Sequence, residues 1–302
     1  MYAPFSYLQQ SVVGSAPAVL PDITGGTVNT FTSGGITYRS HKFTGDGTLV
    51  VNSLGTLSTV QLLVVAGGGA GGFGNTSGGG GAGGYILSSS YSLTVGTINV
   101  RVGAGGAANT NQFGTGSPGN LSGFFNVTAS GGGGGAGDGV TIALGAGGSG
   151  GGNGVNSSAS PGAGIFGQGF SGSRGILAPP YPAGGGGGAN NAGGTGSYLN
   201  AGGSGSFNSL ELGTAQSYAG GGFGGTQFDN NTFAIFTSGS TGGSGRGANR
   251  SYPNVATFPQ SASAGLTNLG GGGGGGAGGS GEGSRNAGAG GSGVVIVTYL
   301  YQ

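Results

Sequence analysis

Glycine tracts separated by short apolar segments constrain this sequence more than any other feature. Glycine accounts for 86 of the 302 residues, and it occurs in short runs rather than scattered singly. A chain this poor in side chains lacks the volume to fill the core of an ordinary helical or α/β domain. The chain must therefore stay disordered or pack its backbone against other segments of backbone.

The charge content favours order and excludes several functions. Only 4% of the residues are charged, the net charge is +1, and 34% are hydrophobic, whereas disordered segments escape collapse through charge and low hydrophobicity. The dispersed cations predict no binding to nucleic acid. The absence of cysteine excludes disulfides and thiolate metal sites. No apolar stretch approaches the roughly 18 residues of a membrane span, so no membrane insertion is expected.

Alternating apolar residues indicate β-strands in the first half of the chain. Every second residue is apolar in Thr97–Val102, and similar alternation occurs in Tyr91–Val95 and Val140–Leu144. Val60–Val65 and Val294–Val297 are apolar on both faces, which is typical of strands buried inside a sheet. We therefore predict an all-β fold with essentially no α-helix, in which the C-terminal strand completes an antiparallel β-sandwich.

Three regions are expected. Residues 1–26 read as an extended arm because prolines interrupt them, either as a frayed terminus or as a docking peptide for a larger assembly. Residues 27–144 and 293–302 form the predicted β-sandwich, and residues 145–292 form an inserted bundle of glycine tracts. The candidate docking residues of the arm are Tyr2, Phe5, Tyr7 and Leu8.

The glycine tracts carry a period of three. Non-glycine residues recur three apart, as at Ala70 and Phe73 or at Ala289 and Ser292. A polyproline-II-type helix has three residues per turn and no internal hydrogen bonds, so such spacing places the side chains on one edge. The bare edges then allow neighbouring polyglycine-II helices to bond laterally, because buried backbone groups need partners. The uninterrupted runs are predicted at the centre of this bundle: Gly131–Gly135, Gly184–Gly188 and Gly270–Gly276.

An ordered series of blocks resembles the glycine-rich domain of many bacteriophage and large-virus proteins. Together the blocks cover about residues 36 to 300, and they are Tyr38–Thr44, Gly47–Val51, Val60–Gly69, Gly83–Ile86, Ile98–Gly106, Phe125–Gly135 and Gly290–Tyr299. The resemblance implies a virion or host-recognition protein, including tail-fibre components. The polyglycine arrangement is similar to that of distal tail-fibre adhesins of T-even-like phages, although the loops do not match them residue by residue.

No constellation of residues indicates catalysis. His41 is the only histidine and lies in an expected strand without a nearby carboxylate, so we interpret it as structural. The six carboxylates are isolated in sequence, so neither an enzyme, a metal site nor a cofactor is predicted.

Aromatic loops interrupt the glycine tracts and are the candidate binding elements. Rigid scaffolds that carry variable loops are a common design for binding sites, and tyrosine-rich loops contact partners at low entropic cost. The alternative, weighed equally, is that these aromatic residues cap the ends of the tracts. The candidates are Tyr181, Tyr198, Phe207, Tyr218, Phe228, Phe233, Phe236, Tyr252 and Phe258.

These observations predict a non-enzymatic protein of the virion surface, foremost a tail-fibre or adhesin module that presents loops to a host receptor. The alternatives are a capsid or tail decoration protein and an extracellular glycine-rich matrix or wall protein. Expected partners are other virion proteins, bound through the N-terminal arm, and a host surface receptor, with homo-oligomers left open.

Overall fold

The computed structural model is all-β. It describes residues 19–110, 113–141, 144, 146–178, 181–194, 201–228, 242–243, 249–251, 261–277 and 286–301, with only the backbone at 227–228 and 249–251. Strands are the only regular secondary structure among these residues, which confirms the predicted class. The described residues include no helix long and apolar enough to cross a membrane.

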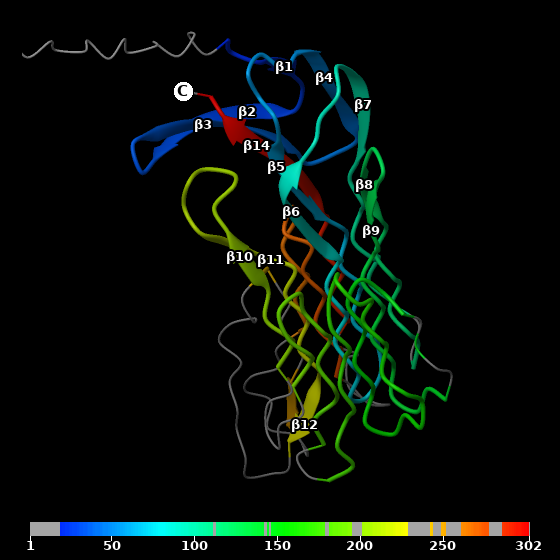
Figure 1. The fold of residues 1–302 in the computed structure, drawn as a ribbon. Coiled ribbons are helices and arrows are strands. Elements are labelled where there is room, and N and C mark those ends of the chain that lie inside the picture. The colour runs from blue at the N-terminus through cyan, green and yellow to red at the C-terminus, as the bar shows by residue number, and fades with distance from the viewer. Residues whose placement is uncertain are drawn as a thin grey trace, which may run out of the picture.

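Two five-stranded antiparallel sheets lie at one end of the molecule (Figure 1). The first has the order β1-β4-β7-β8-β9, and the second has the order β2-β3-β14-β5-β6. The first sheet consists of β1 (Asp22–Thr24), β4 (Gly47–Ser53), β7 (Gly96–Arg101), β8 (Ser122–Phe124) and β9 (Val127–Ala129). The second consists of β2 (Thr27–Ser33), β3 (Ile36–Phe43), β14 (Val294–Leu300), β5 (Val60–Val65) and β6 (Tyr85–Tyr91).

The C-terminal strand completes the second sheet, as predicted. β14 pairs with β3 on one side, with Val297 opposite His41, and with β5 on the other, with Val297 opposite Leu62. Both β5 and β14 are buried along nearly their whole length, which agrees with their apolar sequences. A strand that is apolar on both faces must have other residues packed against each face. In the second sheet, each face is accordingly covered by its own hydrophobic cluster.

One face of the second sheet packs against the first sheet. Leu62 and Val64 of β5 share a hydrophobic cluster with Leu49 of β4, Ile98 of β7 and Phe124 of β8. On the opposite face, Leu63 and Val65 pack with residues 210 and 218–219. Those residues belong to a small hairpin formed by β10 (Ser206–Asn208) and β11 (Gln216–Tyr218). The parallel pair of β12 (Thr226–Phe228) and β13 (Asn249–Ser251) lies at the far end (Figure 1).

Two of the predicted strands are not strands in the structure. Ser92–Val95 follows the end of β6 and has no strand pairing. Val140, Thr141 and Leu144 also lie outside every strand, while residues 142–143 are outside the described part of the chain. Leu93, in the predicted strand Tyr91–Val95, is nevertheless buried in the core between the sheets. The apolar alternation in this segment therefore indicates a buried residue and not a paired strand.

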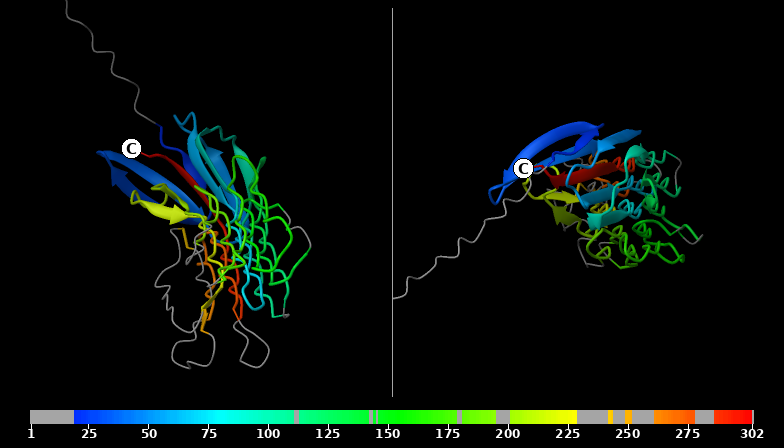
Figure 2. Two further views of the ribbon diagram at one scale, coloured as in Figure 1. Left: turned by 90° about the horizontal axis from the view of Figure 1, so that it is seen from below. Right: turned by 45° about the horizontal axis from the view of Figure 1, so that its top comes forward.

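Glycine tracts run from the sheets toward the opposite end of the molecule, side by side (Figures 1 and 2). All seven N–H groups of residues 67–73 donate to carbonyl groups of other segments. Gly67, Ala70 and Phe73 donate to Asn120, Ser117 and Gly114, so donors three apart meet one neighbour. The intervening donors meet two further tracts, around residues 288–291 and 78–81. The hydrogen bonds therefore follow the three-residue period predicted from the sequence.

Two tracts occupy the centre of this lattice. The tract 67–73 exchanges backbone hydrogen bonds with six others, because it also accepts from residues around 106, 132–135 and 273–276. The tract 78–84 likewise has six neighbours. Three of those six contain the uninterrupted glycine runs, around residues 130–136, 184–187 and 270–273. The predicted centre was therefore wrong, because the central tracts are the two that connect β5 to β6.

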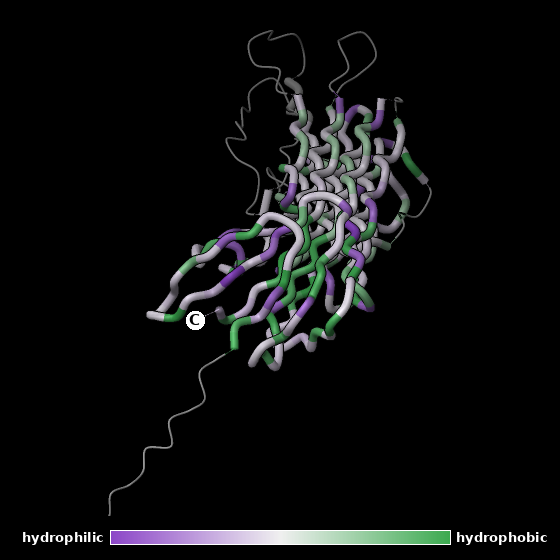
Figure 3. The backbone as a smooth tube through the Cα atoms, turned by 90° about the horizontal axis from the view of Figure 1, so that it is seen from above, coloured by the Kyte–Doolittle hydropathy of each residue, from purple (hydrophilic) through white to green (hydrophobic). Residues whose placement is uncertain are grey.

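The close approach of the tracts requires glycine. A Cβ added at Gly69 would lie less than 3.0 Å from the Gly133 carbonyl oxygen, and one at Gly80 would lie equally close to that of Gly69. Figure 3 shows that hydrophobic residues concentrate in the strands, whereas the glycine tracts are nearly neutral in hydropathy. The tracts on the two sides of residue 145 also bond to one another. The Gly133 N–H, for example, donates to the Ser149 carbonyl at 2.9 Å. The lattice therefore extends beyond the predicted insert of residues 145–292.

Candidate functional site

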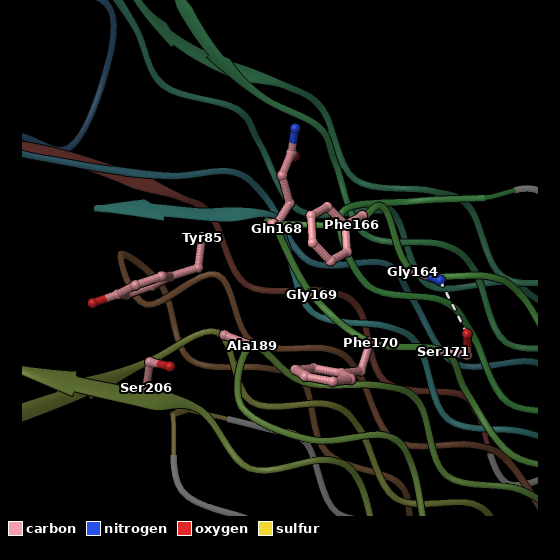
Figure 4. Close-up of a pocket in the computed structure, with 10 residues that line it drawn as sticks. Tyr85, Gly164, Phe166, Gln168, Gly169, Phe170, Ser171, Ala189 and Ser206 are labelled. Carbon is pink, nitrogen blue, oxygen red and sulfur yellow. Dashed lines mark hydrogen bonds between the residues drawn. The ribbon is translucent and has the colours of Figure 1, made fainter. Parts of the chain in front are cut away.

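An open pocket of 590 Å³ lies where the edge of the second sheet meets the glycine tracts. Tyr85, the first residue of β6, and Ser206, the first residue of β10, line one side (Figure 4). Phe166 and Phe170 line the other side, and both belong to the segment 164–171 (Figure 4). The pocket therefore combines the edge of a sheet, a small hairpin and a loop between glycine tracts.

A tight turn projects Phe166 into solvent. The N–H groups of Gln168 and Gly169 donate to the Ile165 carbonyl at 3.0 and 3.1 Å. Gly167 has a φ of +78°, a left-handed conformation that glycine adopts without steric cost. The turn leaves the Phe166 side chain fully exposed and that of Phe170 about half exposed.

Hydrogen bonds hold this turn from two sides. The Tyr85 N–H donates to the Gln168 carbonyl at 2.9 Å, and the Ser130 N–H donates to Gln168 Oε1 at 2.8 Å. Phe170 donates its N–H to the Gly188 carbonyl at 3.1 Å and accepts at its own carbonyl from Gly150 at 3.0 Å. The loop that carries the two rings is thus fixed to the sheet and to two tracts.

The opposite wall is equally well supported. Tyr85 lies opposite Val65 in the β5–β6 pairing, and its ring packs against the cluster that contains Val65 and Tyr218. Asn208 Nδ2 donates to the Tyr85 hydroxyl at 3.3 Å. Burial raises the pKa of Tyr85, so its hydroxyl remains protonated at neutral pH.

The three candidate aromatic residues whose side chains the structure describes do not gather at one place. Phe207 is exposed on β10, adjacent to Ser206 of the pocket wall but on the alternate face of the strand. Tyr181 is partly exposed at the far end, beside Pro182, which bridges to Thr226 of β12. Tyr218 is fully buried and donates its hydroxyl to Glu211 Oε2 at 3.2 Å, so it contributes to the core.

The remaining candidates are only partly or not at all described. Phe228 ends β12, but its side chain lies outside the described atoms. The other candidate binding residues outside the described part are Tyr198, Phe233, Phe236, Tyr252 and Phe258. The candidate docking residues of the arm, Tyr2, Phe5, Tyr7 and Leu8, lie outside it as well.

Phe166 and Phe170 were not among the aromatic residues predicted as candidates from the sequence. A signal was present, because the segment Gly164–Phe170 contains two phenylalanines among three glycines and one glutamine, with a single isoleucine to pack against. Such a segment lacks apolar partners of its own. Whether its rings are buried or exposed depends on the turn at Gly167, which composition does not determine.

His41 and the Lys42–Glu211 pair make contacts that stabilise the fold. His41 is buried, with Nδ1 2.8 Å from the Gly25 carbonyl and Nε2 3.0 Å from the Tyr299 hydroxyl. Lys42 Nζ lies 2.6 Å from Glu211 Oε1. Among the described residues, no group of three or more His, Cys, Asp or Glu side chains is placed to bind a metal ion.

Comparison with known proteins gives the family. The profile of a glycine-rich domain matches residues 43–300, which is well over half of the chain. The chain belongs to this glycine-rich domain family. The match begins in β3 and ends in β14, so the family's domain covers most of both sheets together with the lattice of tracts. No curated protein was found to match the chain.

Proposed function

We propose that this protein is a non-enzymatic structural protein of a virion surface, and that it acts as a tail-fibre or adhesin module. In this proposal the glycine lattice is a rigid support, and the loops at its ends, with the aromatic pocket, contact a host receptor. The predicted arm of residues 1–26 is shortened by the structure, because Asp22–Thr24 form β1 of the first sheet, and in this proposal the residues before β1 attach the module to other virion proteins.

The observation that carries the proposal is the six-fold hydrogen bonding of the two central tracts. Residues 67–73 and 78–84 are each bonded to six neighbours, so the loops that connect the tracts start from fixed positions. Loops on a rigid support are suited to binding because little conformational entropy is lost on contact. The exposed Phe166 side chain is such an element, since an aromatic ring in solvent is a typical contact residue.

We also propose that the tracts are polyglycine-II helices. The supporting observation is the three-residue period with which consecutive N–H groups turn to three different neighbours. This geometry joins tracts in all lateral directions, whereas strands of a sheet bond only to two neighbours. A bundle of this kind provides stiffness without a hydrophobic core.

The adhesin function is tested by binding of the purified protein to cells. We expect fluorescently labelled protein to adhere to cells of its host. We expect exchange of the segments 229–236 and 252–259, which leaves the lattice residues Phe223–Gly225 unchanged, to reduce adhesion about tenfold or more. The control exchanges Gly34-Gly35, in the β2–β3 turn, for Asn-Gly. Both glycines have positive φ values, which Asn-Gly accommodates, so this variant retains the fold and should adhere normally.

Two outcomes would contradict the adhesin proposal. If the loop-exchanged protein has a normal circular dichroism spectrum and adheres as well as the parent protein does, the exchanged loops do not take part in recognition. Electron microscopy of the assembled particle that shows this chain repeated over the capsid lattice, rather than at a fibre tip, would indicate a decoration protein instead.

A further inference from the structure

The pocket between β6 and the segment 164–171 has a wall of aromatic rings and no charge. Tyr85, Phe166 and Phe170 supply the rings, and every residue that lines the pocket is uncharged. Its volume of 590 Å³ is within the range of about 300–1,000 Å³ that is typical of pockets for small ligands. The pocket is therefore matched to a neutral ligand with at least one apolar face.

The polar groups of the pocket are small and neutral. Ser206 and Ser171 add hydroxyl groups to the lining, and the Ser171 hydroxyl accepts a hydrogen bond from the Gly164 N–H at 3.3 Å. Glycines 164, 167 and 169 bring backbone close to the surface. This combination of ring faces and neutral hydrogen-bonding groups corresponds to a molecule that carries both C–H faces and hydroxyl groups.

We propose that this pocket binds a neutral saccharide unit, packed against Phe166 and Phe170 with its hydroxyl groups toward Ser206 and the neighbouring backbone. A pyranose ring presents a flat face of C–H groups, which packs against an aromatic face, while its equatorial hydroxyl groups point outward. The proposal rests on the proposed adhesin function, for which it names the class of receptor.

The structure disfavours charged ligands at this site. A phosphorylated or sialylated group needs a cation or an array of free N–H groups to compensate its charge. The lining has no cation, and the N–H groups of Gln168, Gly169 and Phe170 are already bonded within the fold. Neutral hexoses and N-acetylhexosamines place no such demand on the pocket.

The backbone that carries the two rings is held in position before any ligand binds. The backbone of the turn is bonded to Tyr85, Ser130, Gly150 and Gly188, so binding requires little ordering of the loop. Phe166 has the further property that its side chain touches little of the protein, because it is fully exposed. Its removal therefore affects a ligand without affecting the fold.

The experiment applies the full-length protein to an array of immobilised neutral oligosaccharides of glucose, galactose, mannose and their N-acetyl derivatives, together with sialylated and phosphorylated counterparts. We expect binding to a subset of the neutral glycans and weaker binding to their charged counterparts. Phe166→Ala and Phe170→Ala should each reduce affinity for the best neutral glycan about tenfold, measured by calorimetry, and Phe166→Tyr should retain it.

The matched control is Phe125→Ala. Phe125 is also strongly exposed, but it lies in the turn between β8 and β9 and does not line the pocket. Phe125→Ala should bind as the parent protein does, and Phe166→Ala should keep the parent's thermal midpoint. A Phe170→Ala variant that loses stability would be set aside in favour of Phe166→Ala, which decides the test alone.

Three results would overturn the saccharide site: no binding to any neutral glycan, a preference for charged glycans, or equal losses in the Phe125 and Phe166 variants. The adhesin function is judged separately. Protein that adheres to host cells equally well with Phe166→Ala and Phe170→Ala would contradict the saccharide site and leave the adhesin function standing. Glycan binding that depends on the two rings, without any adhesion to cells, would support the saccharide site and contradict the adhesin function.

Discussion

At the scale of the residue, Gly80 shows that a missing side chain is a structural requirement of the lattice. A Cβ at this position would lie less than 3.0 Å from the carbonyl oxygen and carbon of Gly69, both of which are backbone atoms. Backbone atoms cannot rotate away as the end of a side chain can. The tract would have to separate from its neighbour and lose hydrogen bonds on that side.

We therefore expect Gly80→Ala to lower the free energy of unfolding by about 2–3 kcal/mol, measured by urea denaturation. Gly45→Ala is the control, because a Cβ there meets no atom within 4 Å and the φ of Gly45 is not left-handed. The control should be neutral or slightly stabilising. Equal stability of the two variants would contradict the close packing of tracts 67–73 and 78–84.

His41 gives the protein a predicted pH dependence. Its pKa is lowered from 6.5, first by burial and further by the Arg39 charge, although the Gly25 carbonyl hydrogen bond opposes this. The unfolded chain therefore takes up a proton at higher pH than the folded protein does. The stability that His41 contributes is complete above about pH 6.5 and decreases as the pH falls below that value.

This dependence is measured by urea denaturation between pH 8 and pH 5. Because His41 is the only histidine, and histidine is the side chain whose unperturbed pKa lies between pH 5 and pH 8, we assign the decline expected in this window to His41. We expect His41→Gln to be less stable at pH 8 but to have a flatter profile from pH 6.5 to 5. A profile as steep as that of the parent protein would assign the decline to another group.

At the scale of the element, the β10–β11 hairpin covers one face of the second sheet and is attached to it by polar contacts. Thr298 of β14 donates its hydroxyl to the Leu210 carbonyl at 2.7 Å, and Ser40 of β3 donates to the Glu211 carbonyl at 2.7 Å. The Glu211 carboxylate accepts from both Lys42 and Tyr218. These contacts fix the hairpin that supplies Ser206 to the pocket.

A double-mutant cycle tests the Lys42–Glu211 pair. Both side chains are about four-fifths buried, at 21% and 18% exposure, so we expect a coupling free energy of about 1 kcal/mol between Lys42→Met and Glu211→Gln. Asp22→Asn is the control, since that residue is exposed and its carboxylate accepts a hydrogen bond from the exposed Asn52 side chain. Its effect should stay within about 0.5 kcal/mol. No measurable coupling would show that the hairpin is held by its apolar contacts alone.

Individual strands were predictable where one strong pattern dominated. β5 coincides with the apolar run Val60–Val65, and β14 contains Val294–Val297, because a strand buried on both faces is apolar throughout. Tyr91–Val95 was predicted as a strand and is not one beyond Tyr91, since alternation also arises where a loop tucks single apolar residues into the core. β2 has mostly exposed side chains and therefore carries little such signal.

At the scale of the whole molecule, the lattice and the sheets are expected to unfold together. The two central tracts continue directly from β5 and into β6, so the lattice cannot separate without disturbing the second sheet. We expect the amides of residues 67–73 and 78–84 to exchange about a thousandfold or more slowly than unstructured amides, as those of β14 should. Hydrogen exchange with mass spectrometry measures this, and rapid exchange of the tracts beside a protected β14 would contradict it.

The sequence by itself determined the fold class, the return of the C-terminal strand, and the three-residue period of the glycine tracts. Each of these is a local pattern of side-chain size and polarity, which the chain carries wherever it folds. Tertiary structure alone decided which tracts are central and which aromatic residues share a pocket. A glycine tract has no side chain to specify its neighbour, so its place follows from the strands at its ends, and for that reason 67–73 and 78–84 are central. Phe166 and Tyr85 line one pocket for the same reason, since neighbouring tracts and the edge of β6 hold the turn at Gly167 beside the sheet.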